Sequence, residues 1–423
     1  MDTIFALSSG PPPAGIAVVR ISGPAAGDAL IAVAGALPAP RRARLARLRD
    51  GQGAVLDDAL ALWFPGPNTA TGEDLAELHL HGGRAVVAAV ERALAVLPGL
   101  RPAQAGEFTR RAFTNGRMDL AEAEGLGDLL IAETELQRQA AVAMLGGALS
   151  RQVEGWRERL LMLSARVEAA LDFDDEDDVA GLPPSFNADI AALEQDLALA
   201  LAAPSAEALK EGFRVALAGP PNAGKSTLFN ALVDDEAAIT APLAGTTRDV
   251  LVRNVALGGI AFSFIDMAGL RDEAADEVEA IGITRAGQEI ARADLVLWLG
   301  PEGAGPAGCW EIEAQCDRGQ AGKQAPLFRL SALTGQGMDA LREALIDEAR
   351  KAMPRPGQAA LNRRQRDLLA RTSGDLAASR KVQDPLLLAE HLRNCRVAFD
   401  RLVGRTSTED VLDALFGRFC IGK

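Results

Sequence analysis

The sequence predicts a multidomain protein with an α+β N-terminal domain, a discontinuous α-helical domain and an α/β domain inserted into the helical one. Three observations predict this class: short β-rich runs near the start, strand–loop–helix alternation in the middle, and long helical periodicity on both sides of that alternation. With 423 residues, 48% of them hydrophobic and 24% charged, the chain can form several cores and has a globular composition.

Local patterns predict the individual elements. The runs Ile16–Ile21 and Ala59–Phe64 are β-rich, and residues 86–97 repeat apolar side chains at helical spacing. From Asp119 to Ala203 apolar residues recur every three or four positions, and this periodicity returns after the proline hinge at 354–356. The expected boundaries are 1–116 for the N-terminal domain, 117–208 and 351–423 for the two parts of the helical domain, and 209–350 for the inserted domain.

Charge and cysteine usage exclude some classes of protein. The net charge of −14 argues against a general nucleic-acid coat. No apolar run reaches the roughly 18 residues of a membrane span, so no membrane association is expected. The four cysteines, Cys309, Cys316, Cys395 and Cys420, show no CxxC spacing. A cytoplasmic protein in a reducing compartment is therefore expected.

Residues 219–226 (GPPNAGKS) fit the phosphate-binding pattern G-x-x-x-x-G-K-[ST]. They directly follow the apolar run FRVALA and precede the helical run TLFNAL. Glycines allow backbone N–H groups to curl round phosphates, and the helix N-terminus adds its positive dipole end. Lys225 can reach the β- and γ-phosphates, and the Ser226 hydroxyl can bind Mg²⁺. The alternative is a turn without a nucleotide, and the strand-then-helix context argues against it.

Three further motifs follow in the order that a Ras-like GTPase domain requires. The first is GTTRD at 245–249, a candidate switch segment in which Thr247 would bring its hydroxyl to Mg²⁺. Next comes the run FSFIDMAG, which ends in D-x-x-G: Asp266 can hold Mg²⁺ through water, and the Gly269 N–H can sense the γ-phosphate. Last, residues 331–333 follow the run PLFRL, where a backbone loop usually touches guanine. Together these motifs predict a GTP-binding α/β domain.

The guanine-reading motif N-K-x-D is degenerate. At its place the chain has Ala314-Gln315-Cys316-Asp317, so Asp317 can still accept hydrogen bonds from the base, but the bracing Asn and Lys are missing. Only about nine residues separate the run DLVLWLG from the next strand, which is too few for the usual connecting helix. Weakened discrimination between guanine and adenine is therefore expected.

Beyond these motifs, the sequence resembles the MnmE (TrmE) family of tRNA-modification GTPases over nearly its whole length. The resemblance rests on DTIFALSS, GIAVVRISG, TGEDLAELHLHGG, GEFTRRAFTNGRMDLAEAE, GPPNAGKSTLFNAL, AGTTRDV, DMAGLRD, DEVEAIGI and FCIGK. It implies an N-terminal folate-binding and dimerising domain, a split helical domain and an inserted G domain. It also implies a homodimer that binds tRNA and forms a heterotetramer with the FAD-dependent protein MnmG (GidA).

The resemblance also implies the chemistry. Members of the family, with MnmG, add an aminomethyl or carboxymethylaminomethyl group to carbon 5 of the wobble uridine of certain tRNAs. The one-carbon unit comes from a 5-formyl- or methylene-tetrahydrofolate derivative. Hydrolysis of GTP, with Mg²⁺ and stimulated by K⁺, is coupled to dimerisation of the G domains.

Site residues are implied position by position. The folate contacts would be Arg20, Glu77, Arg117 and Lys423, where Arg117 replaces a frequent Lys. Without the resemblance, Arg20 and Glu77 are ordinary surface charges of a strand edge and a helix face. Cys420 stands where the family has a candidate reactive thiol, and the alternative for it is a small buried residue in a turn.

In the G domain the resemblance implies a potassium site and a water-orienting carboxylate. The cation would be held by Asn222, Ala241, Leu243 and Thr246, and Glu279 would orient the attacking water. Met267 replaces the Thr usual in D-T-A-G, a position that contributes no essential ligand. The expected nucleotide-binding residues are Asn222, Ala223, Gly224, Lys225, Ser226, Thr227, Ala241, Pro242, Leu243, Ala244, Gly245, Thr246, Thr247, Asp266, Met267, Ala268, Gly269, Asp317, Ser331, Ala332 and Leu333.

Two other functions remain open at this point. One is a GTPase-like switch that loads a ribosome or RNA partner without base chemistry, which would need neither folate nor Cys420. The other is a weak or nucleotide-promiscuous hydrolase whose folate half persists. Arginines at 41–49 and at 363–366 are candidate contacts for tRNA phosphates, with a solvated face as the alternative.

Overall fold

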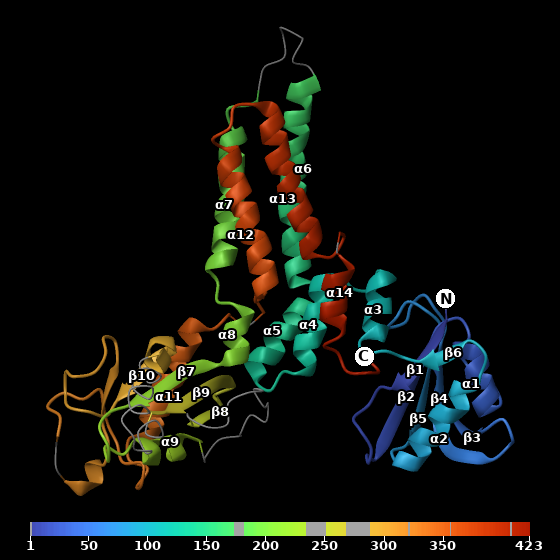
Figure 1. Ribbon diagram of the computed structural model, residues 1–423, viewed down its shortest axis with the longest axis horizontal. Coiled ribbons are helices and arrows are strands. Elements are labelled where there is room, and N and C mark those ends of the chain that lie inside the picture. Colours follow the sequence, from blue (N-terminus) through green and yellow to red (C-terminus); the bar gives the residue numbers. More distant parts are fainter. Residues whose placement is uncertain are drawn as a thin grey trace, which may run out of the picture. The chain divides into compact units, whose positions relative to one another are not determined.

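The computed structural model describes residues 2–172, 182–233, 251–267, 288–319, 322–355, 357–406 and 408–423 (Figure 1). The chain forms two compact units. The first comprises Met1–Gly127, Ser150–Glu154 and Val397–Lys423, and the second comprises Asp128–Leu149 and Gly155–Arg396. Each sheet of the structure belongs to one of these units, so each is described separately.

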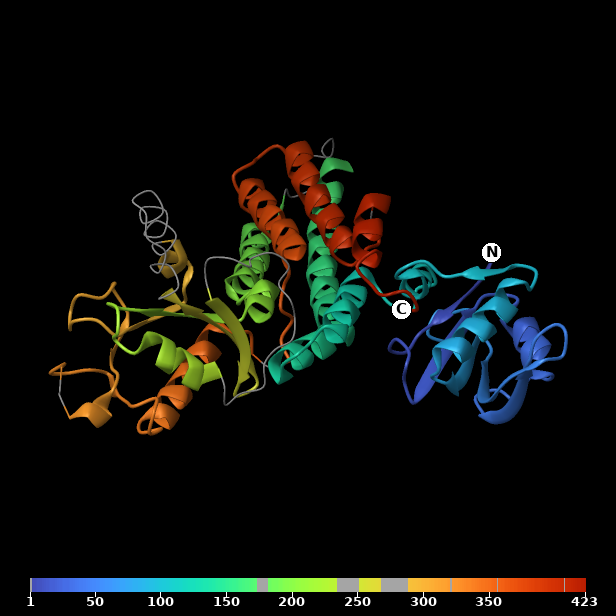
Figure 2. The same cartoon turned by 60° about the horizontal axis from the view of Figure 1, so that its bottom comes forward.

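The first unit contains a six-stranded sheet with the order β3-β4-β5-β2-β1-β6. Its strands are β1 (Thr3–Leu7), β2 (Ile16–Ser22), β3 (Arg44–Arg49), β4 (Val55–Phe64), β5 (Leu75–His81) and β6 (Leu100–Pro102). The expected β-rich runs are thus strands. Helices α1 (Ala26–Ala34) and α2 (Arg84–Ala95) pack on the same buried face of the sheet (Figure 2). Helix α3 (Glu107–Thr114) follows β6.

Alternation along the strands decides which residues lie under α1 and α2. Ala17, Val19 and Ile21 of β2 are buried in the core beneath these helices, together with Leu78 and Leu80 of β5. Because successive side chains of a strand point to opposite faces, the intervening residues of β2 and β5 lie on the other face. Neither α1 nor α2 covers that second face, which carries the register partners Arg20 and Glu77.

The helical segments predicted on both sides of the middle are present. They are α4 (Leu120–Leu130), α5 (Glu135–Leu145), α6 (Ala148–Asp172), α7 (Phe186–Ala202), α8 (Ala206–Glu211), α12 (Arg363–Ser379), α13 (Pro385–Leu402) and α14 (Glu409–Phe416). Helices α6, α7, α12 and α13 run side by side as a bundle (Figures 1 and 2). Capping boxes begin α5 at Thr134 and α12 at Asn362, where each side chain accepts the N–H of a glutamine three residues later.

The second unit contains the predicted α/β sheet, with the order β12-β11-β10-β7-β9-β8. Its strands are β7 (Phe213–Ala218), β8 (Leu251–Leu257), β9 (Ile260–Asp266), β10 (Leu295–Trp298), β11 (Trp310–Glu313) and β12 (Phe328–Arg329). All neighbours are parallel except β8 and β9. Every residue of β9 is buried, as expected for an inner strand of a sheet covered on both faces.

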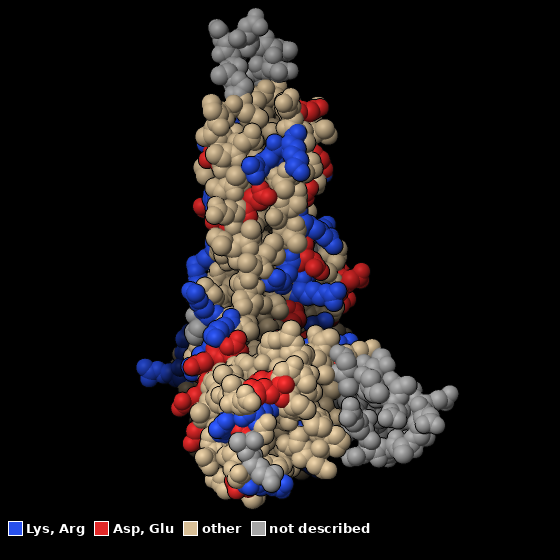
Figure 3. Space-filling view, turned by 90° about the vertical axis from the view of Figure 1, so that its left-hand side faces the viewer, with Lys and Arg blue, Asp and Glu red and all other residues tan. Residues whose placement is uncertain are grey.

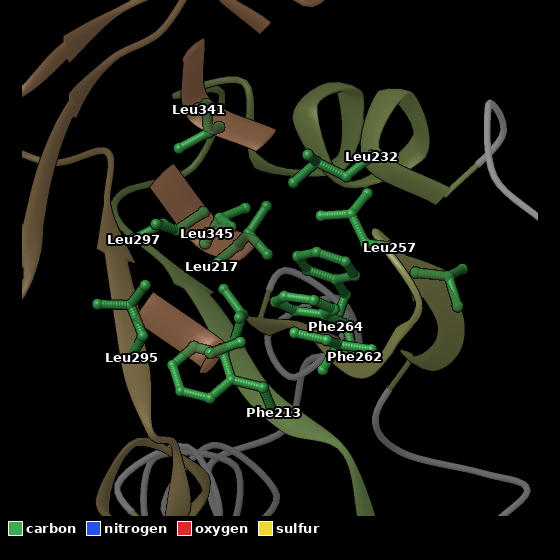
Figure 4. Close-up of a cluster of buried hydrophobic side chains, with 14 of the residues drawn as sticks. Phe213, Leu217, Leu232, Leu257, Phe262, Phe264, Leu295, Leu297, Leu341 and Leu345 are labelled. Carbon is green, nitrogen blue, oxygen red and sulfur yellow. The ribbon is translucent and has the colours of Figure 1, made fainter. Parts of the chain in front are cut away.

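Helices α9 (Lys225–Val233) and α11 (Met338–Ala352) pack on this second sheet. Figure 4 shows the core, in which Phe262 and Phe264 of β9 stack with their ring centroids 5.7 Å apart. Leu341 and Leu345 of α11 are fully buried in the same cluster. Residues 299–309, between β10 and β11, form turns without a helix, as their number predicts. The fold class predicted from the sequence is confirmed.

The visible surface of the second unit mixes both signs of charge. On the face in Figure 3, small groups of basic and acidic side chains alternate with uncharged surface, and neither sign forms a continuous field. Within the described ranges, no helix combines the length and the apolar character needed to cross a membrane.

Candidate functional site

The phosphate loop, residues 219–226, connects the end of β7 to the start of α9. Its backbone has positive φ at Gly219 (150°), Asn222 (62°) and Gly224 (94°). Glycine adopts such angles without steric cost, which explains the two glycines of the motif. Gly219 also lies against the backbone of Leu299 and Gly300, where an added Cβ would come within 3.0 Å. The loop therefore has the curled backbone that anion binding requires.

Lys225 and Ser226 begin α9, and their side chains bond to different partners. The buried Lys225 ammonium donates to the carbonyl oxygens of Gly219 (3.0 Å) and Pro220 (2.8 Å), so it spans the loop. The Ser226 hydroxyl donates to Oδ2 of Asp266 at 2.7 Å. Asp266 is the last residue of β9 and is buried, so the parallel pairing of β7 and β9 brings the two motifs together. Hard oxygen ligands at this spacing fit Mg²⁺.

A cavity of about 850 Å³ opens along the phosphate loop. Besides the loop itself, it is lined by Met267, Ile290, Trp298, Gln315 and Arg318. Trp298 ends β10, and its indole N–H donates to the Pro301 carbonyl at 2.8 Å. The cavity is large enough for a nucleotide and combines polar loop atoms with apolar walls.

The degenerate base motif follows β11 as a tight turn. Gln315 has φ of +65°, and residues Cys316–Arg318 form a single 3₁₀ turn. The Gln315 side chain lies over the phosphate loop: its Nε2 is 3.1 Å from the position that a Cβ on Gly224 would occupy. Asp317 is exposed at the tip of the turn. Gln315 stands at the lysine position of the usual motif, and its side chain thus lies over the phosphate loop.

The loop at 331–333 follows β12 as predicted. The Ser331 side chain is buried and accepts the N–H of Thr334 at 3.2 Å, whereas Leu333 is exposed. The backbone N–H of Cys316 donates to the Leu330 carbonyl at 3.2 Å, which joins this loop to the base motif. Neither Asp317 nor residues 331–333 line the cavity itself.

A polar row crosses the second face of the N-terminal sheet, the face opposite α1 and α2. Arg20 of β2 pairs in register with Glu77 of β5, and its guanidinium donates to Glu77 Oε1 at 2.8 and 3.1 Å. His79 Nε2 lies 3.2 Å from Glu77 Oε2, and the Arg20 guanidinium lies 5.9 Å from the centre of the Phe108 ring. Burial by itself would raise the pKa of Glu77, but the hydrogen bonds and charge of Arg20 and His79 lower it below its usual range.

The last residues of the chain dock on the same unit. The Ser8 hydroxyl donates to the Gly422 carbonyl at 2.9 Å, and Ile421 forms an antiparallel bridge with Ala105. Gly422 has φ of +94°, and a Cβ there would lie 2.0 Å from the Leu7 carbonyl oxygen, so only glycine fits. Cys420 is exposed, which excludes its alternative role as a buried packing residue.

Two models of known protein families match this chain. The family model described as the MnmE helical domain matches residues 120–420, and the model described as the GTP-binding protein TrmE N-terminus matches residues 3–117. The chain belongs to the MnmE family of tRNA modification GTPases. It is similar to the "tRNA modification GTPase MnmE" of Erythrobacter litoralis, with 62% identity over 424 residues that cover 100% of both chains.

Other relatives carry the same description. The one from Novosphingobium aromaticivorans is 63% identical over 435 residues, and the one from Zymomonas mobilis is 48% identical over 437, each covering 100% of both chains. Among solved structures, the G domain of the T. maritima FeoB iron transporter is 24% identical with a TM-score of 0.23, and the alignment covers 32% of this chain and 98% of that chain.

Several residues expected from the MnmE resemblance lie outside the described residues. These are Ala241, Pro242, Leu243, Ala244, Gly245, Thr246, Thr247, Ala268, Gly269 and Glu279. Asn222, Ala223, Thr227 and Met267 lie in or beside the phosphate loop cavity. Of the expected folate contacts, Arg20 and Glu77 are in direct contact. Arg117 is exposed, with its stem over Gly72, and Lys423 ends the docked tail.

The structure brings to these sites other residues that the sequence did not assign to them. His79 and Phe108 join the polar row, and Gln315 and Trp298 line the phosphate cavity. The register of β2 against β5 could have placed His79 near Glu77, because alternate residues of a strand share one face. Nothing local in the sequence marks Phe108 or Trp298, because both depend on long-range packing.

The two arginine groups differ in their surroundings. Arg366 donates to the carbonyls of Ala203 (2.9 Å) and Leu201 (2.6 Å) at the end of α7, so it has a structural role. The arginines of 41–49 are all exposed, on β3 and the loop before it. Arg47 pairs with Asp58, with its Nε 2.8 Å from Oδ1.

Proposed function

We propose that this chain hydrolyses GTP and takes part in the modification of the wobble uridine of tRNA. The observation that carries the proposal is the phosphate loop, in which Lys225 spans the loop and Ser226 lies against Asp266. Family membership adds the tRNA: the relatives that match the full length are described as tRNA modification GTPases. A cytoplasmic location fits this substrate.

In the proposed mechanism the chain binds and orients the phosphates. Backbone N–H groups of residues 219–226 hold their oxygens, and the Lys225 ammonium exchanges its carbonyl partners for the β- and γ-phosphates. Ser226 and Thr247 would hold Mg²⁺ directly, and Asp266 through water. The metal supplies positive charge that offsets the charge developing on the phosphates. Glu279 would orient the attacking water.

A potassium ion would replace the arginine finger used by other GTPases. Asn222 stands at the tip of the phosphate loop with a positive φ, and its amide oxygen is a suitable donor for a hard cation. Ala241, Leu243 and Thr246 would complete the site. Such a cation stabilises charge on the leaving phosphate, and G-domain dimerisation would close the site around it.

The polar row and the docked tail are the proposed site of a tetrahydrofolate derivative. Glu77 is held ionised by Arg20 and His79, and a carboxylate can accept hydrogen bonds from an amino-pterin edge. Arg117 and Lys423 offer cations for the glutamate carboxylates of such a ligand. Cys420 is exposed in the tail and would take part in the base chemistry.

The β3–β4 part of the N-terminal sheet supports a homodimer. Leu45 and Leu60 are register partners on β3 and β4, on the face that α1 and α2 leave uncovered, and they are 71% and 43% exposed. Two adjacent exposed leucines on a sheet face offer a partner an apolar contact. The dimer would bind the FAD-dependent MnmG to form a heterotetramer on tRNA.

Steady-state hydrolysis of GTP and ATP, in potassium and sodium buffers of equal ionic strength, tests the proposal. We expect hydrolysis of GTP with Mg²⁺, stimulated by potassium. Hydrolysis of GTP without potassium stimulation would refute the cation site alone. Absence of GTP hydrolysis in every buffer would refute the proposed function.

A strain carrying Cys420→Ser separates base chemistry from a switch function. Loss of the wobble modification with unchanged GTP hydrolysis is the expected result. An unchanged level of modified uridine would favour a switch that loads an RNA partner without base chemistry.

A further inference from the structure

The G domain contains a buried lysine that the proposed mechanism does not use. Lys323, in the segment before β12, is 6% exposed. Its ammonium donates to the Trp298 carbonyl at 2.8 Å and also to a carboxylate oxygen of Glu311. Burying an ammonium group is costly unless it is fully paired. These two acceptors, at the end of β10 and on β11, therefore specify where Lys323 lies.

Glu313 lies beside this lysine and is also buried, with 7% exposure. Its Oε1 accepts the backbone N–H of Gly322 at 2.5 Å, and its Oε2 lies 2.8 Å from Nε of Arg329. Arg329 in turn donates to the Lys323 carbonyl at 3.1 Å. We call Glu311, Glu313, Lys323 and Arg329 the loop clamp. Its contacts join Glu313, the last residue of β11, to Gly322 and Lys323.

The base motif, residues 314–317, directly follows the loop-clamp residue Glu313. Gln315 and Asp317 both lie in it. In the usual motif an asparagine side chain braces this loop, but Ala314 offers only a methyl group. The loop clamp supplies polar contacts at the base of the loop, where Ala314 can supply none.

The loop clamp also holds the shortened connection between β10 and β11. The Gly303 N–H donates to Glu311 Oε1 at 3.0 Å. From the other side, Glu302 accepts the N–H groups of Gln324 (2.7 Å) and Ala325 (3.0 Å). Charged side chains therefore join the connection 299–309 to the segment before β12.

From these contacts we propose that Lys323, with Glu311 and Glu313, positions the base-recognition loop 314–319 against the phosphate loop and thereby determines selection for guanine. The inference rests on the proposed function, since it concerns the nucleotide of that same site. Holding a loop at its base removes part of its conformational freedom before the ligand arrives, so less entropy is lost on binding. Lys323 and Glu313 act through Gln315 and Asp317 and are positioning residues.

The proposal separates base recognition from phosphate binding. Lys225 and Ser226 bond to Gly219, Pro220 and Asp266, and none of these belongs to the loop clamp. Opening the loop clamp should therefore weaken contacts to the base and leave contacts to the phosphates in place.

The test is equilibrium binding by the full chain of GDP, inosine diphosphate and inorganic tripolyphosphate, each with Mg²⁺. Inosine lacks the exocyclic amine of guanine, so the ratio of the two diphosphate affinities measures how strongly a carboxylate recognises that amine. The affinity for tripolyphosphate measures binding by the phosphate loop alone. The variants are Lys323→Met and Glu311→Ala. The matched controls are Lys351→Met and Glu348→Ala, which remove an ion pair on the exposed side of α11.

We expect Lys323→Met to weaken GDP binding at least about tenfold and to bring the ratio of GDP to inosine diphosphate affinities towards one. Tripolyphosphate binding should stay within about twofold of wild type, and both controls should match wild type. Glu311→Ala should act in the same direction. It decides the question if Lys323→Met does not fold, because Glu311 is more exposed than Lys323.

Three outcomes would overturn the inference. The first is an unchanged affinity ratio in both loop-clamp variants. The second is an equal loss of all three ligands, which would mean that the loop clamp supports the fold in general. The third is a wild-type chain that binds GDP and inosine diphosphate equally, which would leave the GTPase function intact. A wild-type chain that binds no GDP would instead refute the proposed function, and this inference with it.

Discussion

At the scale of single residues, the nucleotide site depends on pairs brought together from distant parts of the sequence. Ser226 and Asp266 belong to separate motifs and meet at 2.7 Å. The motif spacing could predict this pair, because both motifs follow parallel neighbouring strands. The motif spacing could not predict that the Gln315 side chain lies over Gly224, because spacing does not show which side chains contact the phosphate loop.

Removing either oxygen of the proposed magnesium site should abolish most catalysis. Ser226→Ala and Asp266→Asn should each lower kcat/KM for GTP on the order of a hundredfold, or about 2.7 kcal/mol, because the metal loses a ligand or its support. Hydrolysis rates measured over a range of Mg²⁺ concentrations check this. Asp339→Asn, an exposed carboxylate of α11, is the control. Rates like wild type in both variants would disprove the assignment.

The polar row predicts a dependence of stability on pH. The pKa of Glu77 is lower in the folded than in the unfolded chain. The ionised Glu77 therefore contributes fully to folding stability above the unfolded pKa, and this contribution is lost as the pH falls through the folded pKa. Glu77→Gln should lower stability by about 1–2 kcal/mol near pH 7 and by less as the pH falls below about 4.5. Melting temperatures of wild type and variant across this range measure it.

The control for this prediction is Glu158→Gln, which changes an exposed carboxylate of α6. It should shift the melting temperature little at any pH. A constant difference between wild type and Glu77→Gln from neutral to acidic pH would contradict the lowered pKa.

At the scale of elements, periodicity predicted most of the fold. The run Phe213–Ala218 is a strand, and the helical stretch after Asp119 contains the separate helices α4, α5, α6 and α7. The absence of a helix between β10 and β11 also followed from the number of residues. The burial of Lys323 and Glu313 near this connection could not be predicted, since they look like surface charges in the sequence and are buried by long-range packing.

Two helices contain glycines whose replacement should stabilise the protein. Gly155 in α6 and Gly374 in α12 face open space, so a methyl group meets no neighbour. Gly155→Ala and Gly374→Ala should each raise the free energy of unfolding by about 0.5–1 kcal/mol, because alanine loses less backbone entropy in a helix. Thermal or urea unfolding measures this.

Gly422→Ala is the contrasting variant, because its Cβ would collide with the Leu7 carbonyl. It should release the tail, seen as faster proteolysis near the C-terminus. Destabilisation by Gly155→Ala or Gly374→Ala would show that these helices are packed more closely than their open surroundings indicate.

At the scale of the whole molecule, the chain has a net charge of −14 and two exposed leucines on the β3–β4 part of its N-terminal sheet. The negative charge opposes self-association at low ionic strength, so a dimer has to rely on apolar contact. The resemblance to a dimerising family could be seen in the sequence. The surface itself could not, since Leu45 and Leu60 are assigned to one face only by the strand register.

A charged side chain in place of Leu45 should dissociate the proposed dimer into monomers. Leu45→Glu should convert dimer to monomer in sedimentation experiments, with a weaker effect at high salt and no loss of the fold, because the side chain is exposed. Val96→Glu, next to α2 and 76% exposed, is the control and should leave the mass unchanged. A wild-type monomer, or a dimer that survives Leu45→Glu, would place the interface elsewhere.

The position of Trp298 should give the protein an intrinsic fluorescence signal for nucleotide binding. The sequence has four tryptophans and no tyrosine, so ultraviolet emission comes from few sources. Trp298 lines the phosphate cavity, whereas Trp63 and Trp156 are buried in hydrophobic surroundings. Binding of a nucleotide should therefore change the intrinsic fluorescence without any label, and Trp298→Phe should remove that change. Rapid-mixing experiments could then follow nucleotide exchange in the unmodified protein.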